Sequence, residues 1–110
     1  MPIPVEKAAL GYQKFFRTVD ANKIMSGYKP EDMDDRWFIY YEDSWVYFVR
    51  SWTGYHIFGF KLAVSTHGTA SVVASWANRE IDEYQSKSKE NDIQTITDLI
   101  NAIFELDSDD

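Results

Sequence analysis

The chain has 110 residues, of which 45% are hydrophobic and 16% aromatic, and it contains no cysteine. This composition predicts one globular domain with a single hydrophobic core, and it excludes a disulfide scaffold, a thiol nucleophile and a zinc–thiolate centre. The formal net charge of −7 disfavours a general nucleic-acid binder or a protein that docks on anionic membranes.

The first ten residues, MPIPVEKAAL, lack the apolar stretch of a secretory signal, and no apolar run approaches the roughly 20 residues of a membrane-spanning helix. With the absence of cysteine, this favours a cytoplasmic protein in a reducing compartment. The charge is unevenly spread, because residues 36–79 have a net charge of +2 and the remainder has −9. Acidic flanks of this kind keep a small domain in solution, or they dock on a basic protein partner.

Residues 1–35 are expected to form a helix and then an acidic loop. From Pro4 to Val19 the apolar residues recur at helical spacing, and Pro4 suits the first turn of a helix. The segment 20–35 contains glycine, proline and the charge run EDMDD, which predict a long connection with a short helical turn after Pro30.

Residues 36–79 are rich in aromatic and β-branched residues and predict a four-stranded sheet. The turn candidates Asp43-Ser44, Thr53-Gly54 and His67-Gly68 separate the runs, so the strands are expected to form an antiparallel meander. The four predicted strands are residues 36–42, 45–52, 55–64 and 69–78.

Residues 80–106 predict a polar loop and a C-terminal helix over 92–106, with Asn91 or Asp92 as its N-cap. The tail at 107–110 is acidic. The predicted fold is α+β in a single domain, with an N-terminal helix, a four-stranded antiparallel β-meander and a C-terminal helix. The apolar stripe of the last helix consists of Ile93, Ile96, Leu99, Ile100, Ile103 and Phe104.

Two-residue turns would set the register of the central hairpin. They would put Trp45, Tyr47, Val49 and Ser51 opposite Leu62, Phe60, Phe58 and His56 on the main core face. Arg50 would lie on the second face of the sheet. The row across that face would read Trp37, Arg50, Ile57 and Asn78, with Trp76 opposite Gly59 and three of the four tryptophans on this face.

Arg50 is the leading candidate for a site, since a plain buried strand has no use for a guanidinium. A guanidinium stacked on an aromatic ring can still present its planar fork to a carboxylate, a phosphate or a planar ring. The alternative is that a terminal helix covers this face and an acidic side chain from a flank pairs with Arg50. The candidate ligand-binding residues are Arg50, Trp37, Trp52, Tyr55 and Asn78.

Other chemical signals in the sequence are weak. Ser51 and His56 would be cross-strand neighbours, like a nucleophile and its base, but no G-x-S-x-G turn surrounds Ser51 and no acid is placed behind His56. His56 and His67 begin and end one hairpin, and EDMDD lacks the glycine and distal glutamate of an EF-hand loop. We therefore expect no catalytic residue, no metal site and no cofactor.

The stretches RWFIYY, VRSWTGYHIFGFKL and ASWANRE resemble a small family of uncharacterised bacterial domains with an RWF…RSWTG pattern, over about residues 36–80. No activity is established for that family, so the resemblance implies no mechanism. It implies only that Arg36, Trp37, Arg50, Trp52 and Gly54 form the signature of the family.

These patterns favour non-catalytic binding of a small anionic or planar ligand, or of a partner segment, on the Arg50 face. The alternative is an acidic interaction protein that docks on, or neutralises, a basic protein partner. Neither nucleic acid nor a membrane is expected as a partner, and a homodimer is left open. An enzyme would need a catalytic constellation that the sequence does not display.

Overall fold

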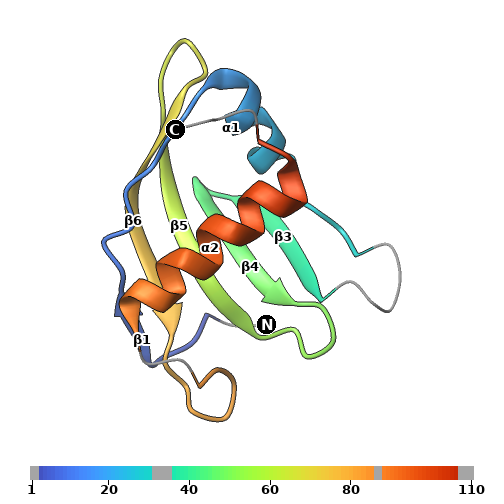
Figure 1. The fold of residues 1–110 in the computed structure, drawn as a ribbon, viewed down its shortest axis with the longest axis vertical. Coiled ribbons are helices and arrows are strands. Elements are labelled where there is room, and N and C mark those ends of the chain that lie inside the picture. The colour runs from blue at the N-terminus through green and yellow to red at the C-terminus, as the bar shows by residue number, and fades with distance from the viewer. Residues whose placement is uncertain (1–2, 31–35, 86–87, 107–110) are drawn as a thin grey trace.

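The computed structural model describes residues 3–30, 36–85 and 88–106, which form one antiparallel sheet and two helices (Figure 1). The strands follow the order β1-β6-β5-β4-β3, and β2 also pairs with β6. This arrangement confirms the predicted α+β class. The elements are β1 (Lys7–Ala9), β2 (Phe15–Phe16), α1 (Thr18–Met25), β3 (Trp37–Glu42), β4 (Trp45–Arg50), β5 (His56–Val64), β6 (Ala70–Asn78) and α2 (Lys89–Phe104).

The four central strands, β3 to β6, are the predicted antiparallel meander. Asp43 and Ser44 form the first turn, with φ values of 53° and 76°. Positive φ at both central residues is characteristic of the type I′ turn, whose twist matches that of the two flanking strands. The predicted two-residue turn is therefore confirmed, and with it the pairing of Trp37 with Arg50.

The predicted N-terminal helix is wrong. Residues 7–16 instead run along the outer edge of β6 as the short strands β1 and β2, which adds two strands to the sheet. Leu10, Tyr12 and Phe16 are buried. The two-residue spacing of Leu10 and Tyr12 fits a strand alone, whereas the four-residue spacing of Tyr12 and Phe16 fits a strand as well as a helix. The edge of β6 decides between them, since it offers backbone partners such as the Ser75 carbonyl, which accepts from the Leu10 amide at 3.1 Å.

Helix α1 begins at Thr18, inside the segment that was predicted to be a helix followed by a loop. The acidic run at 31–35, the turn expected after Pro30 and the acidic tail at 107–110 include positions outside the described residues.

The predicted C-terminal helix is confirmed, although α2 begins three residues earlier than expected. Its N-cap is Ser88, whose hydroxyl oxygen accepts from the Asn91 amide at 3.2 Å, so neither Asn91 nor Asp92 is the cap. The helix ends at Phe104, and Glu105 follows in the left-handed region with φ of 50°.

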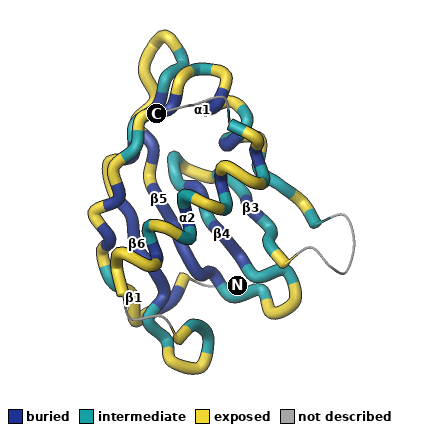
Figure 2. Tube along the Cα trace, in the orientation of Figure 1, coloured by how far each residue is buried: buried dark blue, intermediate teal, exposed yellow. Residues whose placement is uncertain are grey.

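Helix α2 lies diagonally across one face of the sheet, and α1 lies beside its C-terminal end (Figure 1). The main core is the layer between α2 and the sheet, and the buried parts of the strands line it (Figure 2). No helix of the described chain covers the opposite face of the sheet. Fully buried side chains of this core include Ile39, Val46, Phe48, Phe58, Phe60, Ile96 and Ile100.

Candidate functional site

Arg50 and Trp37 form the centre of the predicted site, and the structure brings them together. They are paired across β3 and β4, and the guanidinium carbon of Arg50 lies 4.6 Å from the centre of the Trp37 ring. The Trp37 ring stacks in turn on Phe58, with ring centres 6.0 Å apart and planes inclined by 22°. Phe58 is fully buried, so the arginine lies on a stack of rings that is anchored in the core.

The predicted face of Arg50 is wrong, because the central hairpin is shifted by one residue. Tyr47 pairs with Gly59 and not with Phe60. Since side chains alternate along a strand, a shift of one residue exchanges the two faces of β4. Arg50 therefore shares the face of Val46 and Phe48, which α2 covers.

A β-bulge and a longer loop cause this shift. Phe48 pairs with Phe58, but Val49 pairs with His56, so Ile57 is an extra residue on β5. The connection between the strands spans residues 51–55, where the predicted turn had only Thr53 and Gly54. The row of Trp37, Arg50, Ile57 and Asn78 is thus interrupted, because the bulge places Ile57 in the core.

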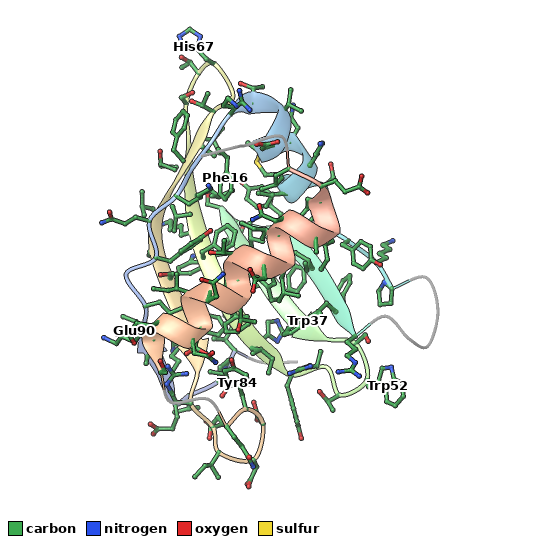
Figure 3. All side chains as sticks on the ribbon, viewed as in Figure 1. Phe16, Trp37, Trp52, His67, Tyr84 and Glu90 are labelled. Atoms are coloured by element: carbon green, nitrogen blue, oxygen red, sulfur yellow. The ribbon has the colours of Figure 1, made fainter. Side chains whose placement is uncertain are left out.

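The other three predicted site residues lie apart from the guanidinium in different ways. Tyr55 is its neighbour through the backbone, since the Tyr55 carbonyl accepts from the Arg50 amide at 2.9 Å, and its ring packs against the core. Trp52 is 74% exposed and lies at the outer end of the connecting loop, away from Trp37 (Figure 3). Asn78 is fully buried at the end of β6 and takes no part in this site.

Asn78 has a structural role instead. Its amide group donates to the His56 carbonyl and to a Glu83 carboxylate oxygen, both at 2.8 Å. Its carbonyl oxygen accepts from the Glu80 amide at 2.6 Å. Asn78 therefore ties the bulged end of β5 to the loop that follows β6.

Two arginines on the helix-covered side of the sheet differ in their partners. Arg79 forms an ion pair with Asp92, with Nη2 and Oδ2 2.6 Å apart. For Arg50, no carboxylate of the described residues lies within ion-pair distance, and Trp37 is its side-chain contact. The alternative expected from the sequence had two parts. A helix does cover the face of Arg50, but no acidic side chain of the described residues pairs with Arg50.

The opposite face of the sheet contains an aromatic cluster. The predicted register had assigned two of its members, Trp45 and Tyr47, to the main core face and a third, Trp76, to the second face. The rings of the cluster come mainly from the neighbouring strands β3 and β4. The ring centres of Tyr40 and Tyr47 are 4.9 Å apart, and those of Trp45 and Tyr47 are 6.2 Å apart. The signal that could have revealed this cluster is the turn at Asp43 and Ser44. The pairing that this turn sets puts Phe38, Tyr40, Trp45 and Tyr47 on one face of the β3–β4 hairpin, opposite to the face of Arg50. We call this surface the aromatic face, and it consists of Phe38, Tyr40, Trp45, Tyr47 and Trp76.

Gly59 allows the aromatic face to lie close to the sheet. As predicted, Trp76 pairs with Gly59 across β5 and β6. A Cβ atom at Gly59 would lie 2.7 Å from the Trp76 ring, which real side chains do not tolerate. The bare backbone of Gly59 is thus the surface on which the indole rests.

His56 is buried beneath the aromatic face, where its Nε2 lies 2.6 Å from the Tyr40 hydroxyl. Burial lowers the pKa of His56 and raises the pKa of Tyr40, so both groups are neutral near pH 7. The Tyr40 hydroxyl and His56 Nε2 therefore form a hydrogen bond between two neutral groups, and the tautomer of the ring decides which of them donates. Ser51 is not the cross-strand partner of His56, because that partner is Val49.

Comparison with protein-family models, curated proteins and solved structures found no match to this chain. In the described residues, no helix is long and apolar enough to cross a bilayer. The same part of the chain contains no group of three or more histidine, aspartate or glutamate side chains placed to hold a metal ion. The site must therefore be interpreted from its own geometry.

Proposed function

We propose that this protein binds, without chemical conversion, a small ligand that combines an anionic group with a planar ring, and that the ligand contacts Arg50 and Trp37. One observation carries the proposal. Arg50 is a half-buried guanidinium that is stacked on an aromatic ring and has no carboxylate partner among the described residues. A partly desolvated cation of this kind gains from an anion supplied from outside.

The chemistry of the two side chains selects the ligand class. Arginine presents a planar fork of donors that matches a carboxylate or a phosphate in two parallel hydrogen bonds. The guanidinium carbon of Arg50 lies over the Trp37 ring, so a planar ring attached to the anion can pack against the same aromatic surface. Arginine stays charged and indole does not titrate near neutral pH, so these groups hold and orient a ligand and do not exchange protons with it.

The position of the pair also supports a binding role. The diagonal path of α2 leaves Trp37 beside the helix and not beneath its axis (Figure 3). Trp37 and Arg50 are both only partly buried, whereas Phe48 and Phe58 below them are fully buried. The rigid core thus holds the pair in one orientation at a solvent-accessible margin.

The experiment is a titration of tryptophan fluorescence with adenosine monophosphate, with adenosine and with inorganic phosphate. The monophosphate combines ring and anion, so it should bind more tightly than either of the other two. Arg50→Met should weaken its binding roughly tenfold or more, because a charge-assisted contact is lost. The matched control is Lys14→Met, which also removes one positive charge. Lys14 lies beside β2, which pairs with β6 at the edge of the sheet opposite to β3.

Arg50→Met should remain folded, since a cation–π contact contributes about 0.5–1 kcal/mol when exposed and about 2 kcal/mol when desolvated. Circular dichroism and the urea midpoint would check this. No fluorescence response of the parent protein to any of the three compounds would refute the proposed function. Equal affinity of the parent and Arg50→Met for the monophosphate would refute the role of Arg50.

A further inference from the structure

The aromatic face lies on the side of the sheet that no described helix covers, and its composition is unusual for such a surface. An antiparallel sheet with one covered face normally places polar side chains on the other face. Here, Tyr40 and Phe38 on β3 and Trp45 and Tyr47 on β4 take those outward positions, and all four are only half-buried. Aromatic enrichment of this kind is characteristic of the buried centre of a protein–protein interface.

The charges on this face lie in one row across three strands. Trp45 pairs with Glu42 of β3 on one side and with Lys61 of β5 on the other. Both charged residues are exposed. The row is thus acidic at one end, aromatic in the middle and basic at the other end.

We propose that the aromatic face binds a second copy of this chain. The two sheets pack face to face about a two-fold axis that runs parallel to the strands and passes over β4. This axis places β3 of one copy over β5 of the other. Glu42 of each copy then lies opposite Lys61 of the second copy, so the two charges form two equivalent ion pairs. This self-complementarity of the row identifies a second copy as the occupant.

The same axis brings the rings into register. Trp45 and Tyr47, on the axis strand, meet their own counterparts in the second copy. Tyr40 lies one strand from the axis, so it faces the row position of Gly59, where the Trp76 ring covers the backbone. Aromatic rings of one copy therefore meet aromatic rings of the other across the interface, in the ring-to-ring contacts that aromatic side chains favour.

The net charge of −7 does not prevent this contact, because the acidity lies outside the sheet. Residues 36–79, which contain the central strands, have a net charge of +2, and the remaining residues have −9. Repulsion between exposed acidic flanks is screened over about 8 Å at physiological ionic strength. The interface itself brings together one acidic and one basic side chain from each copy.

Sedimentation velocity over a range of concentrations tests the proposal. The parent protein should be a dimer that dissociates on dilution. Trp45→Lys should weaken dimerisation by roughly 30-fold or more, as expected for an aromatic residue at the centre of an interface. Trp52→Lys is the matched control, because this tryptophan is 74% exposed but lies on the connecting loop away from the aromatic face, and it should leave the association unchanged.

Charge exchange tests the two-fold axis. Glu42→Lys alone and Lys61→Glu alone should each weaken the dimer roughly tenfold, since each places like charges opposite one another. The double variant exchanges the signs and should restore parent affinity. A parent protein that is monomeric at all concentrations, or a dimer that Trp45→Lys leaves unchanged, would overturn the proposal. A double variant that is weaker than both single variants would overturn the axis.

Discussion

Arg79→Met should destabilise the fold strongly, because Arg79 neutralises a fully buried carboxylate. Asp92 has no exposed surface, and its two oxygens accept from the Arg79 guanidinium at 2.6 Å and the Tyr84 hydroxyl at 2.7 Å. Methionine keeps most of the aliphatic volume but leaves Asp92 with one donor and no countercharge. Breaking a buried ion pair in this way costs about 3–5 kcal/mol, which is a large part of the 5–15 kcal/mol that stabilises a typical domain.

Urea unfolding followed by circular dichroism measures this loss directly. Arg36→Met is the matched control, since Arg36 is exposed and its replacement should change the free energy of unfolding by less than about 0.5 kcal/mol. The double variant Arg79→Met/Asp92→Leu removes both charges and should be more stable than Arg79→Met alone, because no unpaired carboxylate remains. If Arg79→Met changed stability no more than Arg36→Met, the ion pair would not hold the loop and α2 together.

Three further predictions concern the core and the pH dependence of stability. Ile100→Ala should cost about 2–5 kcal/mol in urea unfolding because Ile100 is fully buried, and Leu99→Ala should cost less because Leu99 is only partly buried; equal losses would show that α2 is rotated about its axis. Burial lowers the folded-state pKa of His56, so its contribution to stability is present above pH 6.5 and is lost as the pH falls, and this acid-dependent loss should be smaller in His56→Gln. Burial raises the pKa of Tyr12 to about 12, so the contribution of Tyr12 to folding stability is present below pH 10 and is lost as the pH rises through 12. Tyr12→Phe should lack this alkaline loss of stability, and identical alkaline stability profiles for the two proteins would contradict the assignment.

Much of the fold follows from local patterns in the sequence. The aromatic and β-branched runs identify β3 to β6, and the stripe that includes Ile96 and Ile100 identifies α2. The turn at Asp43 and Ser44 was correctly predicted. Because the length of a hairpin turn sets the register of its two strands, the pairing of β3 with β4 was then also correct. Each of these features depends on residues that are close together in the chain.

The errors arise where distant parts of the chain decide the outcome. The four-residue spacing of Tyr12 and Phe16 suits either period, and the edge of β6 makes residues 7–9 and 15–16 strands. The bulge at Ile57 cannot be read from a local pattern, because the Ile57 side chain packs in a core that is built from distant parts of the chain. This one residue reversed the predicted faces of β4, so Arg50 was correctly paired with Trp37 but placed on the wrong side of the sheet.

The loop that follows β6 has a consequence for the exchange of amide hydrogens with solvent. Residues 79–84 contain no strand or α-helix, yet the amides of Arg79, Glu80, Glu83 and Tyr84 all donate to protein acceptors. Amide exchange reports hydrogen bonding and local opening, not the secondary-structure class. These four amides should therefore become labelled by deuterium at rates typical of regular structure, and loss of the Asn78 amide group should release Glu80 first, since the Asn78 carbonyl oxygen is its acceptor.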